Sequence, residues 1–299
     1  MIPELVVISG KGGTGKTSLT ASFALLAERP VVADCDVDAA DLHLVLSPVV
    51  KERHEFWGGR EAVIRQADCR GSGICREVCR FDAVLTAEGP GGVTRFTIDP
   101  VACEGCGVCV RLCPERAIDF PERRSGEWMC SESRCGPMVH ARLGVAAENS
   151  GKLVSIVRRE ARRIAQETES RVVIVDGPPG IGCPVIATLT GASAVLVVTE
   201  PTLSGEHDLE RTLALTRHFG IPASVAVNKW DINPEMTERI ESAARRSGAR
   251  VAGRVRYDPG VTRAQIEART AVEAACPAAE DIIRIWNDFS RLEGTHGGS

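Results

Sequence analysis

Short apolar runs alternate with longer segments of helical periodicity along most of the chain. Residues 5–8 (Leu-Val-Val-Ile) form an apolar run that ends in a glycine-rich turn, a pattern typical of a buried parallel strand. A helix is expected to follow from residue 16 to about 28. The alternation predicts further strands at 31–33, 172–175, 194–198, 224–227 and 250–255, and helices at 39–46, 152–166, after Gly182, and at 209–218, 234–246 and 278–292. This order predicts an α/β fold with a mostly parallel, doubly wound sheet.

The alternation is interrupted between about residues 58 and 126. This segment has few long apolar periods, many Gly and Pro residues, and most of the cysteines. Because strands and helices resume beyond it, we expect an inserted α+β module at 58–126 within one α/β domain formed by 1–57 and 127–299. The last predicted helix, 278–292, has apolar side chains and mixed charges, so we expect it to dock on the core and not on a membrane surface.

Composition narrows the class of protein. The chain has 299 residues, 43% of them hydrophobic, which is enough for an ordinary globular core. No apolar run approaches the roughly 18–20 residues that span a bilayer. The first residues, 1–4, lack the basic region of a signal peptide, so we expect a cytoplasmic location. A net charge of −4 with interleaved signs argues against nucleic acid or a membrane as the main partner.

The turn after the first apolar run carries a phosphate-binding motif. Residues 10–17, Gly-Lys-Gly-Gly-Thr-Gly-Lys-Thr, satisfy the Walker A pattern between a predicted strand and a predicted helix. Glycines let backbone N–H groups surround phosphate oxygens, Lys16 reaches the terminal phosphates, and Thr17 ligates Mg²⁺. The candidate nucleotide-binding residues of this loop are Gly12, Gly13, Thr14, Gly15, Lys16, Thr17 and Ser18.

The cysteines indicate metal binding. Of the 12 cysteines, seven lie between residues 69 and 113, and metal ligation is favoured over disulfides because no signal peptide is expected. Residues 103–114 read C-x2-C-x2-C-x3-C-P, the bacterial ferredoxin run in which three cysteines bind one [4Fe–4S] cluster and the fourth binds another. Structural zinc sites usually use two separated pairs, so zinc is disfavoured.

An altered copy of this run lies upstream. Residues 69–80 repeat the spacing, with Ser72 in place of the second cysteine and Arg80 in place of the proline, which indicates an internal duplication. By ferredoxin crossing, one cluster would take Cys103, Cys106, Cys109 and Cys79. The other would take Cys69, Cys75 and Cys113, with Ser72 facing its fourth corner.

Ser72 weakens the second cluster. A serine hydroxyl has a far higher pKa than a thiol and is a harder donor, so it is a poor iron ligand. We therefore expect a [3Fe–4S] centre or a [4Fe–4S] centre with a labile iron at this site, and a stable [4Fe–4S] cluster at the other. The alternative is that the second site is empty.

The remaining cysteines and histidines give weaker signals. Cys130 and Cys135 have no partner pair, so unligated thiols on a loop are favoured over a metal site. Cys183 stands at the start of a predicted helix, where its pKa could be lowered, but buried packing is favoured. His140 and His207 are single histidines, which are usually not ligands.

Lys11 adds information that phosphate binding does not explain, since Lys16 serves that purpose. Its place resembles the signature lysine of the deviant Walker A ATPases, which include MinD, ParA, Mrp-type cluster carriers and the nitrogenase iron protein. Residues 31–38 and 172–180 also resemble that family's Asp-x-Asp strand and Walker B strand. The resemblance implies a P-loop fold of the SIMIBI type in which Lys11 reaches the partner's nucleotide across a dimer. It further implies that Asp36 orients the attacking water and that Asp176 serves the Mg²⁺.

Two segments are candidates for the nucleotide-base pocket. Residues 228–231, Asn-Lys-Trp-Asp, match the N-K-x-D pattern of GTPases. In MinD-like proteins an asparagine here contacts adenine, so the resemblance favours ATP over GTP and assigns Asn228 to the base. Asp258, after the last predicted strand, is expected at the other edge of the pocket, with an ordinary turn as the alternative.

The whole chain resembles MinD-superfamily ATPases that carry an inserted ferredoxin domain. The resemblance implies a Mg²⁺-dependent ATPase that forms a nucleotide-dependent homodimer. One function it implies is the assembly or delivery of a metal or iron–sulfur cofactor, together with an unidentified metalloprotein or cofactor-assembly partner. The alternative is an ATP-gated electron donor that reduces a partner protein. A positioning scaffold is less well supported, because it would not need clusters.

Overall fold

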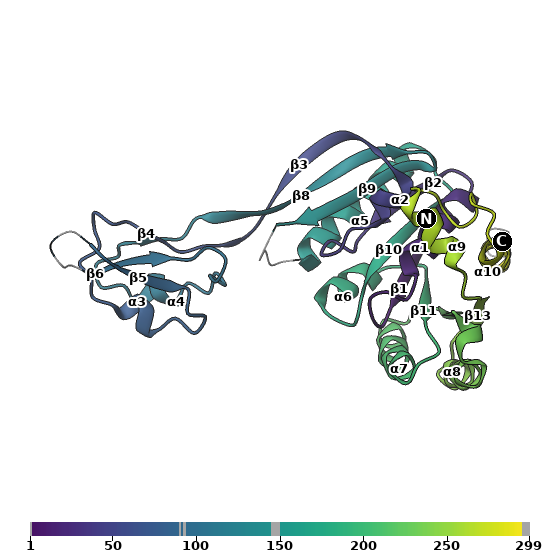
Figure 1. Cartoon of the computed structure of the whole chain (residues 1–299). Helices are drawn as coiled ribbons and strands as arrows, with labels where there is room; N and C mark the ends of the chain where they lie inside the picture. Colours follow the sequence, from purple (N-terminus) through teal and green to yellow (C-terminus); the bar gives the residue numbers. More distant parts are fainter. Residues whose placement is uncertain (1, 90, 92–93, 145–149, 295–299) are drawn as a thin grey trace. The chain divides into compact units, whose positions relative to one another are not determined.

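The computed structural model describes residues 2–89, 91, 94–144 and 150–294, and it divides into two compact units (Figure 1). The larger unit comprises Met1–His54, Trp128–Arg142 and Ser150–Ser299, and the smaller one Glu55–Glu127 and Leu143–Asn149. The segment 58–126, which the sequence pattern predicts to be inserted, lies inside the smaller unit. Two long strands, β3 (Val49–Arg60) and β8 (Glu122–Ser133), each have one end in either unit.

A nine-stranded sheet runs through the larger unit, in the order β13-β12-β11-β1-β10-β2-β9-β8-β3. Strand β1 (Glu4–Ser9) lies between β10 (Val172–Pro179) and β11 (Ala194–Thr199) and is parallel to both. The parallel pairing extends outward through β2 (Pro30–Asp34), β9 (Gly136–Leu143), β12 (Ala223–Asn228) and β13 (Arg250–Val255). The mostly parallel α/β sheet predicted from the sequence is confirmed.

Helices cover both faces of this sheet. On one face, α1 (Lys16–Leu26) packs against α2 (Leu42–Leu46) and α10 (Pro277–Gly294), and α9 (Pro259–Ile266) contacts α2 and α10. Elsewhere α5 (Ser150–Glu167) packs against α6 (Cys183–Leu189), and α7 (Leu203–His218) against α8 (Pro234–Arg246). In β1, Leu5 and Val7 join the core that includes α1 and α10, while Val6 and Ile8 are equally buried. Because neighbouring strand residues point to opposite faces, burial of all four requires cover on both sides.

The C-terminal helix docks on the core, as its sequence predicts. Ile282, Ile285 and Phe289 of α10 are buried, and the ring of Trp286 lies 5.3 Å from that of Phe23 in α1. In the described ranges, no helix combines the length and the apolar character needed to cross a membrane.

The sequence pattern does not predict β3, β8, β9 or α9, and side-chain burial explains why the strands are missed. Most of β3 is exposed and charged, and its buried side chain is Phe56. Strands β8 and β9 bury polar residues such as Ser131 and His140 beside apolar ones, so their apolar alternation is weak. The segment from Cys130 to Cys135, expected as a loop, instead comprises the end of β8 and the turn that leads into β9.

The smaller unit has a repeated plan that matches the duplicated cysteine runs. Strand β4 (Val63–Ile64) pairs antiparallel with β7 (Ile118–Asp119), and β5 (Val84–Glu88) with β6 (Thr94–Ile98). Each cysteine run leads into a short helix, α3 (Ile74–Glu77) or α4 (Val108–Leu112). The residues before these helices, Gly73 and Gly107, have φ values of 77° and 70°, a left-handed conformation that glycine adopts without strain.

Candidate nucleotide-binding site

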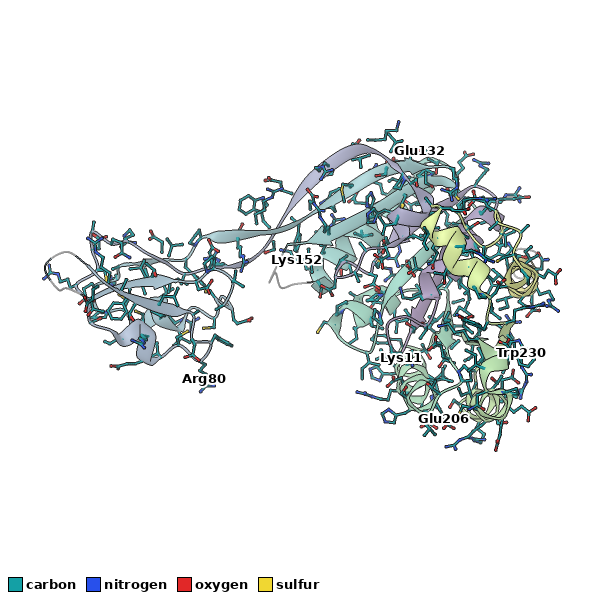
Figure 2. All side chains as sticks on the ribbon, viewed as in Figure 1. Lys11, Arg80, Glu132, Lys152, Glu206 and Trp230 are labelled. Carbon is teal, nitrogen blue, oxygen red and sulfur yellow. The ribbon has the colours of Figure 1, made fainter. Side chains whose placement is uncertain are left out.

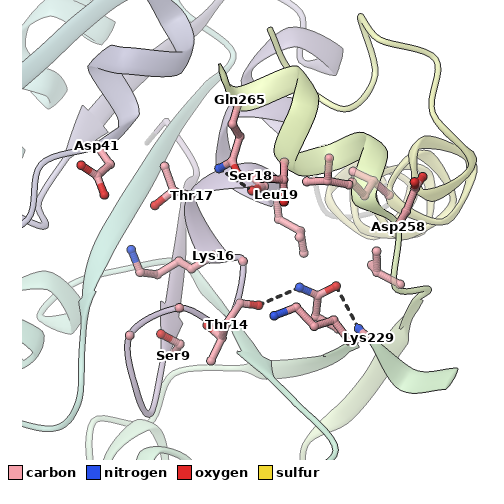
Figure 3. Close-up of a pocket in the computed structure, with 18 of the residues that line it drawn as sticks. Ser9, Thr14, Lys16, Thr17, Ser18, Leu19, Asp41, Lys229, Asp258 and Gln265 are labelled. Carbon is pink, nitrogen blue, oxygen red and sulfur yellow. Dashed lines mark hydrogen bonds between the residues drawn. The ribbon is translucent and has the colours of Figure 1, made fainter. Parts of the chain in front are cut away.

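The loop between β1 and α1 has the backbone of a phosphate cradle. Gly13 and Gly15 adopt left-handed conformations with φ values of 79° and 86°. A Cβ atom on Gly15 would stand 2.3 Å from the side-chain nitrogen of Asn228, so a larger residue would displace that side chain. The loop lines a cavity of about 360 Å³ that also contacts Asp36, Asn228 and Tyr257 (Figure 3). All of the expected residues from Gly12 to Ser18 line this cavity.

Lys16 lies between two carboxylates. Its Nζ atom is 3.0 Å from Oδ1 of Asp176 and 3.3 Å from Oδ2 of Asp36. Burial alone would lower the pKa of Lys16, but the charges of Asp176 and Asp36 outweigh burial and raise that pKa. The lysine is therefore a buried cation, which suits it to neutralise phosphate oxygens.

Asp176, at the carboxyl-terminal part of β10, organises the start of α1. Its two oxygens accept hydrogen bonds from the hydroxyls of Thr17 (2.8 Å) and Thr20 (3.0 Å), besides the contact with Lys16. A carboxylate beside a threonine hydroxyl is the donor pair that holds Mg²⁺ in P-loop proteins. The structure thus brings together Thr17 and Asp176, which lie far apart in the sequence. Thr20 belongs to this cluster, and the sequence analysis does not single it out.

Asp34 is a buried acid behind the expected catalytic aspartate. It pairs in register with Asp176 across the sheet, and its Oδ1 atom accepts a hydrogen bond from the backbone of Asp36 at 3.2 Å. Burial, followed by the charge of Asp176, raises the pKa of Asp34 well above its usual range. Asp34 therefore positions Asp36 through the backbone. Burial also raises the pKa of Asp36 against the opposing effect of Lys16.

The base side of the cavity is built around Asn228. Its side-chain amide donates to the carbonyl of Thr14 at 2.8 Å and accepts from the backbone of Lys229 at 3.0 Å, as the dashed lines in Figure 3 show. Asp231 accepts a hydrogen bond from the backbone of Tyr257 at 2.7 Å. Asn228 therefore ties the phosphate loop to the end of β12.

Asp258 lines the same cavity, but both of its oxygens are already bonded. They accept from the backbone of Gly260 at 2.8 Å and of Ala278 at 3.0 Å. These bonds make Asp258 the N-cap of α9 and join that helix to the start of α10. The geometry thus favours the turn alternative over a direct base contact.

The side chain of Lys11, labelled in Figure 2, reaches the start of α7. Its Nζ atom lies 3.5 Å from Oε2 of Glu200 and 3.4 Å from the hydroxyl of Ser204. The other oxygen of Glu200 contacts Lys229 at 2.5 Å, so a single carboxylate joins Lys11 to the base side of the site. The sequence analysis misses this role of Glu200. The available signal is an acidic residue directly after the carboxyl end of β11.

The cysteine runs of the smaller unit surround a narrow cavity. Cys69, Ser72, Cys75 and Cys113 line it, together with apolar side chains such as Phe96. Burial raises the pKa of Cys75, and the neighbouring Cys69 and Cys113 raise it further. Burial also raises the pKa of Cys109 to about 11, with contributions from Cys103 and Cys106. Cys69, Cys75 and Cys113 thus line one cavity, and Cys103 and Cys106 lie near Cys109. The assignment of Cys79 to the second set stays a prediction.

Several thiols in an apolar cavity are the kind of donor set that would hold an iron–sulfur cluster. Across the described ranges, no group of three or more His, Cys, Asp or Glu side chains is placed to hold a metal ion. A cubane cluster is larger than an ion and is bound at separate corners, so its ligands surround a space and do not converge on a point. Crowded thiols in an apolar cavity resist ionisation without a cation, and iron would relieve that cost.

Cys130, Cys135, Cys183, His140 and His207, which gave weaker signals in the sequence, line neither cavity. Burial raises the pKa of Cys130 on β8 and of Cys135 in the turn that follows, so both are poor nucleophiles. Cys183 is exposed at the first residue of α6, so its predicted burial is wrong: the helix begins at the protein surface. His140 is buried and its Nε2 atom lies 2.8 Å from the hydroxyl of Ser131, whereas His207 is exposed beside Asp208.

The fold and the phosphate loop together define a P-loop nucleotide-binding protein. Residues 5–271 match the family described as "CobQ/CobB/MinD/ParA nucleotide binding domain", and the chain belongs to this family. MinD and ParA proteins are P-loop ATPases, so the site is of the ATPase type.

The chain is also similar to the following three proteins. An uncharacterized protein, MJ0578 of Methanocaldococcus jannaschii, is 34% identical over 237 residues, which cover 78% of this chain and 80% of the relative. One component of the Na⁺-translocating ferredoxin:NAD⁺ oxidoreductase complex of Acetobacterium woodii is 37% identical over 73 residues, 21% of either chain. The septum site-determining protein MinD of Pyrococcus horikoshii, solved with Mg-ADP, superposes with a TM-score of 0.58 at 15% identity, covering 99% of this chain and 98% of that one.

Proposed function

We propose that this chain is a cytoplasmic, Mg²⁺-dependent ATPase that couples its nucleotide state to the assembly or delivery of a metal or iron–sulfur cofactor. The observation that carries the proposal is the joint presence of two sites in one chain. One is the Lys16–Asp176–Thr17 cluster at the phosphate loop, and the other is the set of duplicated cysteine runs around a buried cavity. A nucleotide switch alone would not need the second site.

At the nucleotide site each residue has a defined task. Lys16 leaves Asp36 and Asp176 when the nucleotide binds and neutralises the terminal phosphates. Its departure frees the carboxylate of Asp176 to serve the Mg²⁺ with the hydroxyl of Thr17. Asp36, held by the buried Asp34, orients the water that attacks the terminal phosphorus.

Lys11 makes the active form a dimer. It is not needed by its own phosphate loop, and in the nucleotide-free chain it rests on Glu200. In a nucleotide-bound homodimer Lys11 leaves Glu200 and places its charge on the partner's terminal phosphates. A charge supplied in this way stabilises the transition state as an arginine finger does.

In the smaller unit, Cys103, Cys106, Cys109 and Cys79 hold a [4Fe–4S] cluster. Cys69, Cys75 and Cys113 hold a second cluster beside Ser72, either [3Fe–4S] or a [4Fe–4S] centre with one labile iron. Such clusters supply iron and sulfide for transfer, or a site for one electron. The absence of a thiol at Ser72 favours cofactor delivery over electron donation, because the iron at that corner is held weakly and can leave the chain.

The second candidate function is ATP-gated electron donation to a partner protein. The similarity to a component of a ferredoxin:NAD⁺ oxidoreductase complex favours it. The two functions differ in what leaves the chain: iron and sulfide in the first, an electron in the second.

An anaerobic assay of transfer from this chain to an acceptor protein distinguishes cofactor delivery from electron donation. The reconstituted chain is mixed with an iron-free ferredoxin as the acceptor, with Mg-ATP, with a non-hydrolysable analogue, or with neither. Cofactor delivery predicts that Mg-ATP accelerates the appearance of clusters in the acceptor, with an equal loss of iron from the donor. Lys16→Ala should abolish the acceleration. In a parallel assay the chain is first reduced with dithionite and then mixed with an intact, oxidised ferredoxin. If Mg-ATP speeds reduction of this ferredoxin while the chain retains its iron, the electron-donor function is correct.

A further inference from the structure

The duplicated cysteine runs differ at two positions that lie on the same cavity. Aligning the runs by their cysteines pairs Cys69 with Cys103, Ser72 with Cys106, Cys75 with Cys109 and Cys79 with Cys113. The same alignment pairs Phe81 with Glu115. Because the fourth cysteine of each run crosses to the other cluster, the residues after Cys113 belong beside Ser72.

The structure places Glu115 in that position. Glu115 and Cys113 line the same cavity as Ser72, and the carboxylate oxygen of Glu115 is 3.9 Å from the Cys113 sulfur. Glu115 is half-buried although it follows an exposed proline, Pro114. The cavity that lacks one thiol thus gains one carboxylate.

The other cluster site shows the opposite combination. There all four ligand positions are cysteines, and the residue that corresponds to Glu115 is Phe81, which has no donor atom. Both differences therefore occur at the Cys69–Cys75–Cys113 site. There, a hydroxyl stands in place of a thiol, and a carboxylate stands in place of an apolar side chain.

Carboxylate chemistry suits the vacant corner better than a hydroxyl does. A glutamate side chain is an anion at neutral pH, whereas a serine hydroxyl must lose a proton to become one. Carboxylates are oxygen donors that bind first-row divalent metals, although they hold iron less firmly than thiolates do. An iron held at this corner by a carboxylate would be bound and would still exchange.

We infer that Glu115, and not Ser72, is the ligand of the fourth iron at the Cys69–Cys75–Cys113 site. This inference rests on the proposed function, because it requires clusters in the smaller unit. On this inference, the labile iron is the one held by the carboxylate oxygen of Glu115, which directly follows the run 103–114. The metal ion that this corner would bind is therefore Fe²⁺ or a similar divalent transition metal.

Rebinding of iron tests the inference on the full-length chain. Under anaerobic conditions, mild oxidation with ferricyanide converts a [4Fe–4S]²⁺ centre to [3Fe–4S]⁺ by removing one Fe²⁺ and one electron. Dithionite first reduces [3Fe–4S]⁺ to [3Fe–4S]⁰ by one electron, and titration with Fe²⁺ then restores the four-iron centre. Loss of the low-field, integer-spin EPR signal of [3Fe–4S]⁰ reports the affinity for Fe²⁺. Glu115→Gln should weaken this affinity by at least about tenfold, since even outer partners of metal ligands contribute that much.

Two further variants locate the effect. Glu104→Gln removes an exposed carboxylate of the same run that does not line the cavity, and this variant should bind Fe²⁺ as the wild type does. Ser72→Cys added to Glu115→Gln should restore a stable centre, because it supplies a thiolate at the same corner. The [4Fe–4S] signal of the four-cysteine site shows in every variant whether the module has folded.

The outcomes separate this inference from the proposed function. Equal Fe²⁺ affinity in Glu115→Gln and wild type overturns the inference while the clusters stand, as does a larger loss in Ser72→Ala than in Glu115→Gln. About four irons per wild-type chain, unchanged in Glu115→Gln, would mean an empty second site and also overturn it. A wild-type chain that holds no iron after reconstitution overturns the cluster part of the proposed function itself.

Discussion

Asp34 shows how a single residue's environment sets the chemistry of the nucleotide site. Its side chain is fully buried, pairs in register with Asp176 and supports the backbone of Asp36. Because its pKa is raised in the folded chain, the folded state keeps a proton that the unfolded chain releases near pH 4. Stability therefore falls as the pH rises from about 4 toward the raised pKa.

Replacing Asp34 by asparagine should remove this loss. Asparagine cannot ionise, and its carbonyl oxygen can still accept from the backbone of Asp36. Relative to wild type, Asp34→Asn should gain about 1–3 kcal/mol of unfolding free energy at pH 8 and little at pH 4, measured by urea denaturation. Asp38→Asn, at an exposed position, is the control. A difference that is the same at both pH values would contradict the raised pKa.

Lys11 and Glu200 should have opposite effects on dimer formation. Lys11→Ala removes the charge that acts in trans, so ATP should still bind while hydrolysis falls by about 10³-fold and ATP-dependent dimers are lost. Glu200→Gln removes the partner of Lys11 in the nucleotide-free chain. Since a partly exposed ion pair is worth little, dimers should become tighter by only about threefold.

Sedimentation and phosphate release measure both effects, with Lys51→Ala as the exposed-lysine control. If Lys11→Ala hydrolyses ATP at the wild-type rate, the dimer mechanism is wrong. Weaker dimers in Glu200→Gln would show that Glu200 supports the interface and does not hold Lys11 back.

At the scale of elements, helix α9 is joined to the site by its cap. Asp258 bonds the first turn of α9 and the start of α10, while Gln265 of the same helix donates to Ser18 of α1 at 2.9 Å. Helix α9 therefore closes one wall of the cavity, and its position depends on the cap.

Asp258→Ala should destabilise the chain by about 1 kcal/mol through loss of the cap. ATP and GTP should lose affinity equally, because the base does not contact the carboxylate. Thermal unfolding and nucleotide titration measure the two effects, and Asp258→Asn, which keeps the capping oxygen, should stay near wild type. A selective loss of ATP affinity with unchanged stability would instead assign Asp258 to the base.

At the scale of the whole molecule, two strands connect the units. β3 and β8 each begin in one unit and end in the other, and β3 starts shortly after the segment that carries Asp36. The segment that carries Asp36 is therefore joined along the chain, through β3, to the unit that carries the cysteine runs. Coupling between two binding sites must be reciprocal in free energy.

Nucleotide binding should shift the reduction potential of the clusters. A coupling of about 1 kcal/mol corresponds to about 40 mV for a one-electron couple. EPR-monitored redox titration with and without a non-hydrolysable ATP analogue measures the shift, and reduction should change the affinity for the analogue by the same free energy. Lys16→Ala, which cannot hold the phosphates, should show no shift. Equal potentials in wild type would make the smaller unit a passive appendage.

The sequence by itself determined the features whose residues are contiguous. Strand β13 and helix α8 have the predicted bounds, because short-range periodicity defines them. The phosphate loop could be predicted because its glycines, lysine and threonine must follow one another for the backbone to wrap a phosphate. The duplicated spacing of the cysteines likewise grouped Cys69, Cys75 and Cys113, which line one cavity of the smaller unit.

Only the tertiary structure decided the contacts between elements that are distant in the chain. The pairing of Asp34 with Asp176, the bond from Asn228 to Thr14 and the contact of Lys11 with Glu200 all depend on strand order, which no local pattern encodes. The same holds for β3, whose exposed charged side chains gave no signal because its stability comes from backbone pairing at a sheet edge. The backbone conformation of a strand, a helix or a phosphate loop depends on neighbouring residues in the sequence. In contrast, the pKa of a buried acid and the partner of a lysine depend on the residues that the fold packs against them.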